Sequence, residues 1–105
     1  MSVVTSTVRA KISQATQPTI YNLSMPLANT EYSQLLTNGT KKLLIKTRDR
    51  TAKLRIAFVS GDTNISWVTI EAGSIYSEEN LDLSNVTIYL QANKVSQIAE
   101  ILEWV

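Results

Sequence analysis

The sequence feature that most constrains the fold is a two-armed alternation of side chains between Lys41 and Val59. In each arm every second residue is apolar or β-branched; the two sets are Leu43, Ile45 and Thr47, and Ala52, Leu54, Ile56 and Phe58. A period of two is typical of half-buried β-strands. The segment 48–51 between the arms is polar and lacks glycine, so we expect a hairpin with a loop of about three to five residues.

The same signature recurs at intervals of about ten residues along the chain. Further strands are expected at 20–25, 31–37, 65–71, 75–76, 86–92 and 97–105. The apolar spacing of 97–105 also suits a short helix, but its place in an otherwise all-β chain favours a strand. Asn38-Gly39 predicts a second hairpin that leads into the strand at Lys41.

About eight or nine short strands without a long helix predict an all-β fold, an antiparallel β-sandwich of jelly-roll-like type. A chain of 105 residues suits one hydrophobic core. We therefore expect a single sandwich domain over residues 16–105. Residues 1–15 alternate only weakly and are expected to form an N-terminal strand or arm.

The residue types that are absent exclude several kinds of chemistry. The chain has no cysteine and no histidine, which removes disulfides, thiolate metal sites and the usual general base. Glu78, Glu79 and Asp82 are the densest carboxylates, but two adjacent glutamates in a turn point apart, so a solvated loop is favoured over a catalytic pair or a calcium site. We expect no enzyme activity, no cofactor and no metal.

The sequence also lacks membrane and export signals. Its apolar runs are only a few residues long, so we expect no membrane span. The first residues lack a basic region followed by an apolar one, so we expect no signal peptide and a protein made and used without secretion.

Charge is unevenly divided between the two halves. Residues 1–55 have nine Lys and Arg against two acids, a balance of +7, whereas residues 56–105 have one Lys against seven acids, a balance of −6. The favoured interpretation is pairing of basic and acidic strands within one sheet. Complementary charge between subunits is a second, and a nucleic-acid surface on the basic Lys41–Arg55 hairpin is a less favoured third.

Aromatic and basic side chains supply the candidates for contact with a partner or ligand. Most aromatics are expected in the core, but Tyr89 lies on the face opposite Val86, Ile88 and Leu90. Trp and Tyr on an exposed sheet face can stack on sugar rings, and Trp67 is one such candidate. Trp104 is expected to hold the terminal strand. The candidate interface or ligand residues are Lys46, Arg48, Arg50, Arg55, Tyr76, Tyr89 and Trp104.

Several stretches, taken in order, resemble a known family. They are NTEY at 29–32, KKLLIKTR at 41–48, AGSIY at 72–76, TIYLQA at 87–92 and AEILEW at 99–104. Together they resemble small structural proteins of tailed bacteriophages and prophages, over roughly residues 20–105. The resemblance carries no active site.

The resemblance implies a non-enzymatic virion protein of the head, tail or fibre, made in the bacterial cytoplasm. Such a protein would assemble with copies of itself, for example as a trimer, and with other virion proteins. The alternative is a carbohydrate-binding module that contacts a glycan on the host surface through Tyr89, Tyr76 or Trp67.

Overall fold

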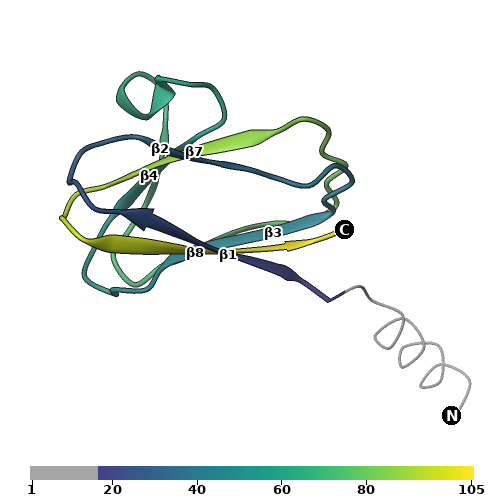
Figure 1. Ribbon diagram of the computed structural model, residues 1–105, viewed down its shortest axis with the longest axis horizontal. Coiled ribbons are helices and arrows are strands. Elements are labelled where there is room, and N and C mark those ends of the chain that lie inside the picture. Colours follow the sequence, from purple (N-terminus) through teal and green to yellow (C-terminus); the bar gives the residue numbers. More distant parts are fainter. Residues whose placement is uncertain (1–16) are drawn as a thin grey trace, which may run out of the picture.

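The computed structural model describes residues 17–105, so the expected N-terminal strand or arm at 1–15 lies outside the described residues. The described chain is all-β, with eight strands in two antiparallel sheets and one 3-10 turn, as expected (Figure 1). The elements are β1 (Thr19–Met25), β2 (Tyr32–Leu35), β3 (Lys42–Thr47), β4 (Leu54–Ala57), η1 (Asp62–Asn64), β5 (Val68–Ile70), β6 (Ile75–Glu78), β7 (Thr87–Ala92) and β8 (Gln97–Trp104).

The strands pair as a jelly roll. One sheet has the order β1-β8-β3-β6, and the other has the order β2-β7-β4-β5. The pairs β1–β8, β2–β7, β3–β6 and β4–β5 are nested, like one long hairpin whose tip is β4–β5. Successive pairs lie in opposite sheets, which wraps this hairpin into the double-sheet arrangement of a jelly roll.

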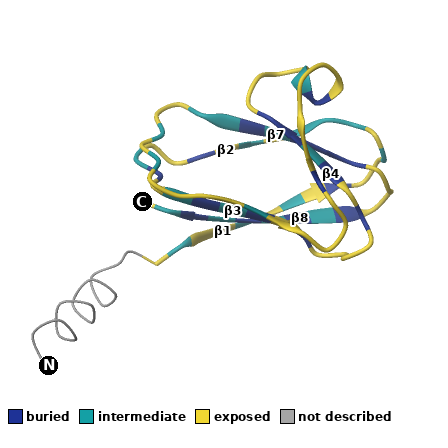
Figure 2. Ribbon diagram, turned by 180° about the vertical axis from the view of Figure 1, so that it is seen from behind, coloured by how far each residue is buried: buried dark blue, intermediate teal, exposed yellow. Residues whose placement is uncertain are grey.

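The core lies between the two sheets and is formed by alternate residues of each strand. Figure 2 shows buried stretches on β3, β4, β7 and β8, the central strands of the two sheets. The large side chains that are fully buried include Met25, Leu43, Ile45, Leu54, Ile56, Ile88, Leu90 and Ile101. The apolar faces predicted for segments 43–47, 54–56 and 88–90 are therefore confirmed, and segment 97–104 is a strand.

The predicted hairpin between Lys41 and Val59 is wrong. β3 pairs with β8 and β6, whereas β4 pairs with β7 and β5, so the two arms lie in opposite sheets. Six residues, 48–53, join them, which is enough extended chain to cross the spacing of about 10 Å between packed sheets. Both arms bury their apolar residues in the same core, from opposite sides. Phe58 was expected on the buried face, but β4 ends at Ala57 and Phe58 is exposed.

Asn38-Gly39 also does not form a hairpin. β2 lies beside β7, and the chain leaves it for β3 in the other sheet. Gly39 has a φ of 87°, a left-handed conformation that glycine adopts readily. The Asn38 carboxamide oxygen accepts a hydrogen bond from the Asn85 amide, 2.8 Å away. The sequence correctly predicted a turn at Asn38-Gly39, but this turn connects strands of the two sheets instead of two adjacent strands of one sheet.

A buried carboxylate joins β8 to β1 and to the link between β2 and β3. Glu103 is fully buried, and within residues 17–105 no cation lies within ion-pair distance of it. The Tyr21 hydroxyl (2.6 Å) and the Thr37 hydroxyl donate to Oε1. The Thr37 amide (3.0 Å) and the Thr40 hydroxyl (2.9 Å) donate to Oε2.

These hydrogen bonds set the protonation state of Glu103. Burial raises the pKa of the carboxyl group, but the hydrogen bonds from Thr37, Tyr21 and Thr40 outweigh it and hold the pKa of Glu103 below its ordinary value of 4.5. The same contact with the carboxylate raises the pKa of the Tyr21 hydroxyl. The charge is therefore stabilised by hydrogen-bond donors alone among the described residues.

We expect Glu103→Gln to destabilise the fold by about 1–3 kcal/mol at pH 7, the typical cost of leaving a buried polar group without its partner. The carboxamide replaces one acceptor oxygen with an NH2 group that faces donors. Urea denaturation measures the change. The matched control is Glu100→Gln on the outer face of the same strand, for which we expect a clearly smaller loss. Equal losses in the two variants would contradict the role given to Glu103.

The contribution of Glu103 to the free energy of unfolding should fall as the pH is lowered. Because its pKa is lower in the folded state than in the unfolded chain, the contribution is fully present above pH 4.5 and is lost as the pH falls through the folded value. The difference in unfolding free energy between the parent chain and Glu103→Gln should therefore narrow on acidification from pH 7 to pH 3. A constant difference across this range would show that the ionised form is not what the site stabilises.

Candidate functional site

The described ion pairs join the basic first half of the chain to the acidic second half. They are Lys42–Glu79, Lys46–Glu100, Arg48–Glu100 and Lys53–Glu71, at 3.2–3.5 Å. Lys46–Glu100 joins β3 to β8 within one sheet, and Arg48, just after β3, joins the same glutamate, as the favoured interpretation of the charge division predicts. Surface ion pairs of this kind contribute about 0–1 kcal/mol each to the free energy of unfolding. They therefore favour the observed strand neighbours but supply only a small part of the stability.

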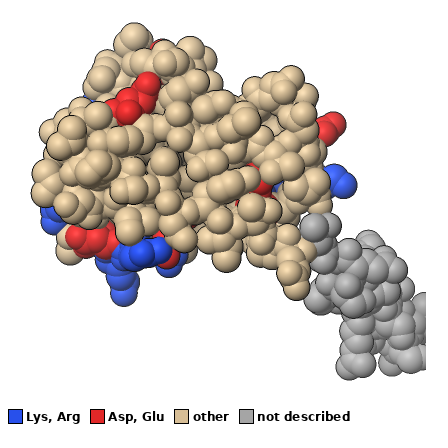
Figure 3. All heavy atoms as spheres, in the orientation of Figure 1, with Lys and Arg blue, Asp and Glu red and all other residues tan. Residues whose placement is uncertain are grey.

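The basic residues of segment 41–55 do not form one surface. Lys46 and Arg48 lie on the outer face of the β1-β8-β3-β6 sheet, whereas Lys53 and Arg55 lie on the outer face of the opposite sheet. Figure 3 shows a cluster of charged side chains at the lower left of this face, with a few others near the upper left and at the right edge. The basic residues of the third interpretation are therefore divided between two faces, and nucleic-acid binding stays a prediction.

Three of the predicted residues, Lys46, Arg48 and Arg50, line one shallow hollow together with Gly73, Ser74 and Ile75. Glu100 forms ion pairs with both Lys46 and Arg48, and these two cations hold the pKa of Glu100 below its ordinary value against the opposing effect of burial. The charge of this hollow is thus partly neutralised from within the sheet.

The predicted aromatics are placed differently from one another. Tyr76 packs against the core, and its hydroxyl donates to Glu78 at 3.1 Å. Burial, with the neighbouring Glu78, raises the pKa of Tyr76 to about 12. Trp104 lies under the Lys42 ammonium, 5.0 Å from the ring centroid. Neither side chain offers an open aromatic face in a pocket.

Tyr89 is half-buried and not the most exposed aromatic of the chain. It lines an open hollow with Leu23, Glu31, Tyr32, Ser33 and Ser60. Ala57 and Ser33 are its cross-strand neighbours on the outer face. It therefore lies on the predicted face, but the exposed aromatics of the described chain are Phe58 (47% exposed), just after β4, and Trp67 (39% exposed), just before β5.

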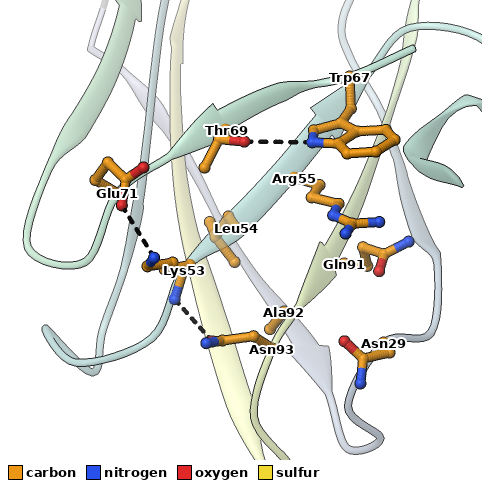
Figure 4. Close-up of a pocket in the computed structure, with 10 residues that line it drawn as sticks. All are labelled: Asn29, Lys53, Leu54, Arg55, Trp67, Thr69, Glu71, Gln91, Ala92 and Asn93. Atoms are coloured by element: carbon orange, nitrogen blue, oxygen red, sulfur yellow. Dashed lines mark hydrogen bonds and ion pairs between the residues drawn. The ribbon is translucent and has the colours of Figure 1, made fainter. Parts of the chain in front are cut away.

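Arg55, the remaining predicted residue, lines a separate hollow on the opposite sheet (Figure 4). We call this hollow the Arg55 pocket; its volume is about 330 Å³, and it is lined by Asn29, Lys53, Leu54, Arg55, Trp67, Thr69, Glu71, Gln91, Ala92 and Asn93. Register places Gln91, Arg55 and Thr69 side by side on β7, β4 and β5. The pocket is thus built from adjacent strands, at outward positions that alternate with the core.

Arg55 and Trp67 form the wall of this pocket. The Arg55 guanidinium lies over the Trp67 ring, 4.0 Å from its centroid, a distance typical of cation–π contact. The Trp67 indole NH donates to the Thr69 hydroxyl at 3.2 Å, as Figure 4 shows. One guanidinium nitrogen of Arg55 donates to the Thr63 carbonyl at 3.2 Å. These contacts fix both side chains before any ligand arrives.

The segment 58–67, which carries Trp67, is itself held to the sheet through Thr63. Glu31 accepts hydrogen bonds from the Thr63 hydroxyl (2.6 Å), the Thr63 amide (3.3 Å) and the Gly61 amide (2.9 Å). The buried Gln91 carboxamide donates to the Thr63 hydroxyl (2.9 Å) and to Asn64 (3.1 Å). Burial raises the pKa of Glu31, but the contacts with Thr63 and Gly61 lower it below its ordinary value.

Sequence reasoning missed most of the polar residues of the pocket, namely Asn29, Gln91 and Asn93. Gln91 and Asn93 occupy the outward positions that follow Tyr89 at a spacing of two, a signal that the sequence contained. Asn29 has no such signal, because it lies in the link between β1 and β2 and is placed by its backbone hydrogen bond to Ala92.

Two kinds of site were not found in residues 17–105. No three histidine, cysteine, aspartate or glutamate side chains gather closely enough there to hold a metal ion. The same residues contain no helix with the length and hydrophobicity to cross a membrane.

Comparison with known proteins gives one weak structural similarity. No protein-family model matches the chain, and no curated protein matches it. Among solved structures, the chain is similar to the solution NMR structure of a de novo designed double-stranded β-helix, with a TM-score of 0.48 and 19% identity. The match covers 86% of this chain and 100% of the designed one.

Glu31→Gln should loosen the 58–67 segment, because the carboxamide cannot accept from all three donors of Gly61 and Thr63. Amide hydrogen exchange measures this, and we expect faster exchange at Gly61 and Thr63 with little change in the core strands. The control is Glu71→Gln, which removes an exposed ion pair with Lys53 and leaves Thr63 untouched. Unchanged protection at Gly61 and Thr63 in Glu31→Gln would contradict this role of the carboxylate.

Proposed function

We propose that the chain is a non-enzymatic structural subunit that assembles with copies of itself as a component of a bacteriophage virion. The observation that carries the assembly part is an apolar surface on a loop that is held in place. The virion part rests on the resemblance of segments 29–32, 41–48, 72–76, 87–92 and 99–104 to phage structural proteins.

The apolar surface lies at the tip of the wrapped hairpin. Phe58, Val59, Ile65 and Val68, which we call the tip surface, are 47%, 60%, 77% and 50% exposed. Burying such a side chain fully is worth about 1.5–3 kcal/mol, so contact with a second copy gives a substantial gain. Because the Thr63 contacts already hold the segment, little conformational entropy remains to be lost on association.

The edge strand β5 beside this surface supports the same proposal. It has only three residues, pairs with β4 on one side and forms the edge of its sheet. A neighbouring copy can add a strand to such an edge through main-chain hydrogen bonds. The tip surface and the β5 edge together give an interface with apolar contacts and a defined direction.

Light scattering tests the assembly. We expect an oligomer at protein concentrations of about 10–100 µM, with little loss of mass at high salt, because the described ion pairs lie within the chain and the interface is apolar. A monomer throughout this range would contradict the proposal. Dissociation by salt would instead indicate an interface made by charge.

A pair of double variants locates the interface. Val59→Ser with Ile65→Ser removes two apolar side chains of the tip surface and should weaken association by about tenfold or more. The control, Ile20→Ser with Ile75→Ser, removes two exposed apolar side chains (60% and 58%) from the outer face of the other sheet and should leave association unchanged. If the control variant weakens association instead, the interface lies on the β1-β8-β3-β6 sheet.

As a second function we propose binding of a carbohydrate at the Arg55 pocket. Trp67, with Arg55 over its ring, and the amide side chains of the pocket favour this, since aromatic and fixed polar groups together line small-molecule sites. A glycan array probed with the parent chain and with Trp67→Ala tests it. Hits that persist in the variant, or no hits with the parent chain, would remove the Arg55 pocket as a carbohydrate site.

A further inference from the structure

The floor of the Arg55 pocket has two parallel rows of polar side chains. The first row is Gln91, Arg55 and Thr69, which are cross-strand neighbours. The second row consists of Asn93, Lys53 and Glu71. Each lies two residues from its first-row counterpart, just beyond the paired residues of the strands. Figure 4 shows Trp67 above Arg55 and Asn29 across from it. The pocket therefore presents one aromatic wall and a polar floor.

The two cationic side chains of this floor, Lys53 and Arg55, differ in whether a carboxylate lies nearby. The Lys53 ammonium lies 3.4 Å from a Glu71 carboxylate oxygen. Arg55 has no carboxylate within ion-pair distance in residues 17–105. Only one of its guanidinium nitrogens donates to a described protein group, the Thr63 carbonyl. Arginine has five N–H donors in a planar fork, so Arg55 retains both charge and donors for a ligand.

The remaining lining groups suit hydroxyls. Asn29 and Asn93 are exposed amides that can both donate and accept. The Gln91 carboxamide uses its nitrogen on Thr63 and Asn64, and Figure 4 shows its oxygen on the side facing Asn29. The volume of about 330 Å³ lies near the lower end of small-molecule sites, which suits one or two sugar rings.

We infer that the Arg55 pocket binds a saccharide that carries a carboxylate, with the carboxylate on the Arg55 guanidinium and the hydroxyls on the surrounding amides. The inference rests on the second proposed function and adds the chemical class of the sugar. Planar guanidinium and planar carboxylate match in a two-point hydrogen-bonded pair. A phosphate would also suit the guanidinium, and titration with inorganic phosphate separates the two ligands.

NMR titration of the full chain tests the inference directly. The probes are D-galacturonic acid and its methyl ester, which differ in charge and hardly in shape. We expect the acid to shift the indole NH signal of Trp67 in a saturable way, and the ester to bind at least tenfold more weakly. The indole NH of Trp104, which lies on the other sheet, serves as the control within the same spectrum.

Two variants assign the contacts. Arg55→Lys keeps the charge but loses the planar fork, and we expect it to weaken binding of the acid at least fivefold, whereas Arg50→Lys outside the pocket leaves binding unchanged. Asn29→Gly keeps a positive φ (54° in the parent chain) while removing the amide, so weaker binding there reports the loss of the side chain. An unchanged amide spectrum outside the pocket shows that each variant is folded.

Three outcomes would overturn the inference. Equal binding of the acid and its ester would show that the carboxylate is not recognised, and would leave carbohydrate binding itself in place. A Trp67 shift produced equally by acetate or inorganic phosphate would show an anion site without sugar recognition. No shift with the acid at about 10 mM, where even weak sites respond, would remove the inference, and the glycan array alone would then decide the second proposed function.

Discussion

The fold depends on the hydrogen bonds that stabilise one buried carboxylate. Glu103 has its charge at the end of β8, between the sheets, where an isolated carboxylate would be strongly unfavourable. It is tolerated because Tyr21, Thr37 and Thr40 converge on it with four hydrogen bonds. Those donors come from β1 and from the link between β2 and β3. The site therefore fixes how β8 lies against β1, and where the chain leaves one sheet for the other.

For segments 43–47, 54–56 and 88–90 the sequence predicted which side of the strand is buried, and it did so through simple alternation. Leu43 and Ile45, like Ile88 and Leu90, lie in the core as the period of two requires. Alternation says nothing about which strand lies alongside, because every inward-facing strand of a sandwich shows the same pattern. The links 36–41 and 48–53 have lengths that suit a hairpin loop and a crossing between sheets equally well. Which strands pair therefore depends on how all eight described strands pack together.

The same limit explains why the sequence predicted only part of the candidate site. Arg55 was identified from its place among basic residues, but the group around it was not, because Gln91 and Thr69 become its neighbours only through the pairing of β7, β4 and β5. Lys46 and Arg48, close to Arg55 in sequence, lie on the opposite face of the sandwich. Proximity along the chain was therefore misleading for the basic residues and uninformative for the amides.

The nesting of strand pairs has a consequence for the order in which the chain can fold. Among the eight strands of residues 17–105, only β4 and β5 pair with a direct neighbour in sequence, so they close the shortest loop and lose the least chain entropy on meeting. Each pair further out encloses the previous one, ending with β1 and β8, which join Thr19 to Glu103. A fold with such distant contacts is expected to form slowly. Until β8 pairs, the side chain of Glu103 stays in water. Thr37 and Thr40 lie on the link between β2 and β3, but Tyr21 lies on β1, whose described partner is β8, so the full set of donors assembles only in this last step.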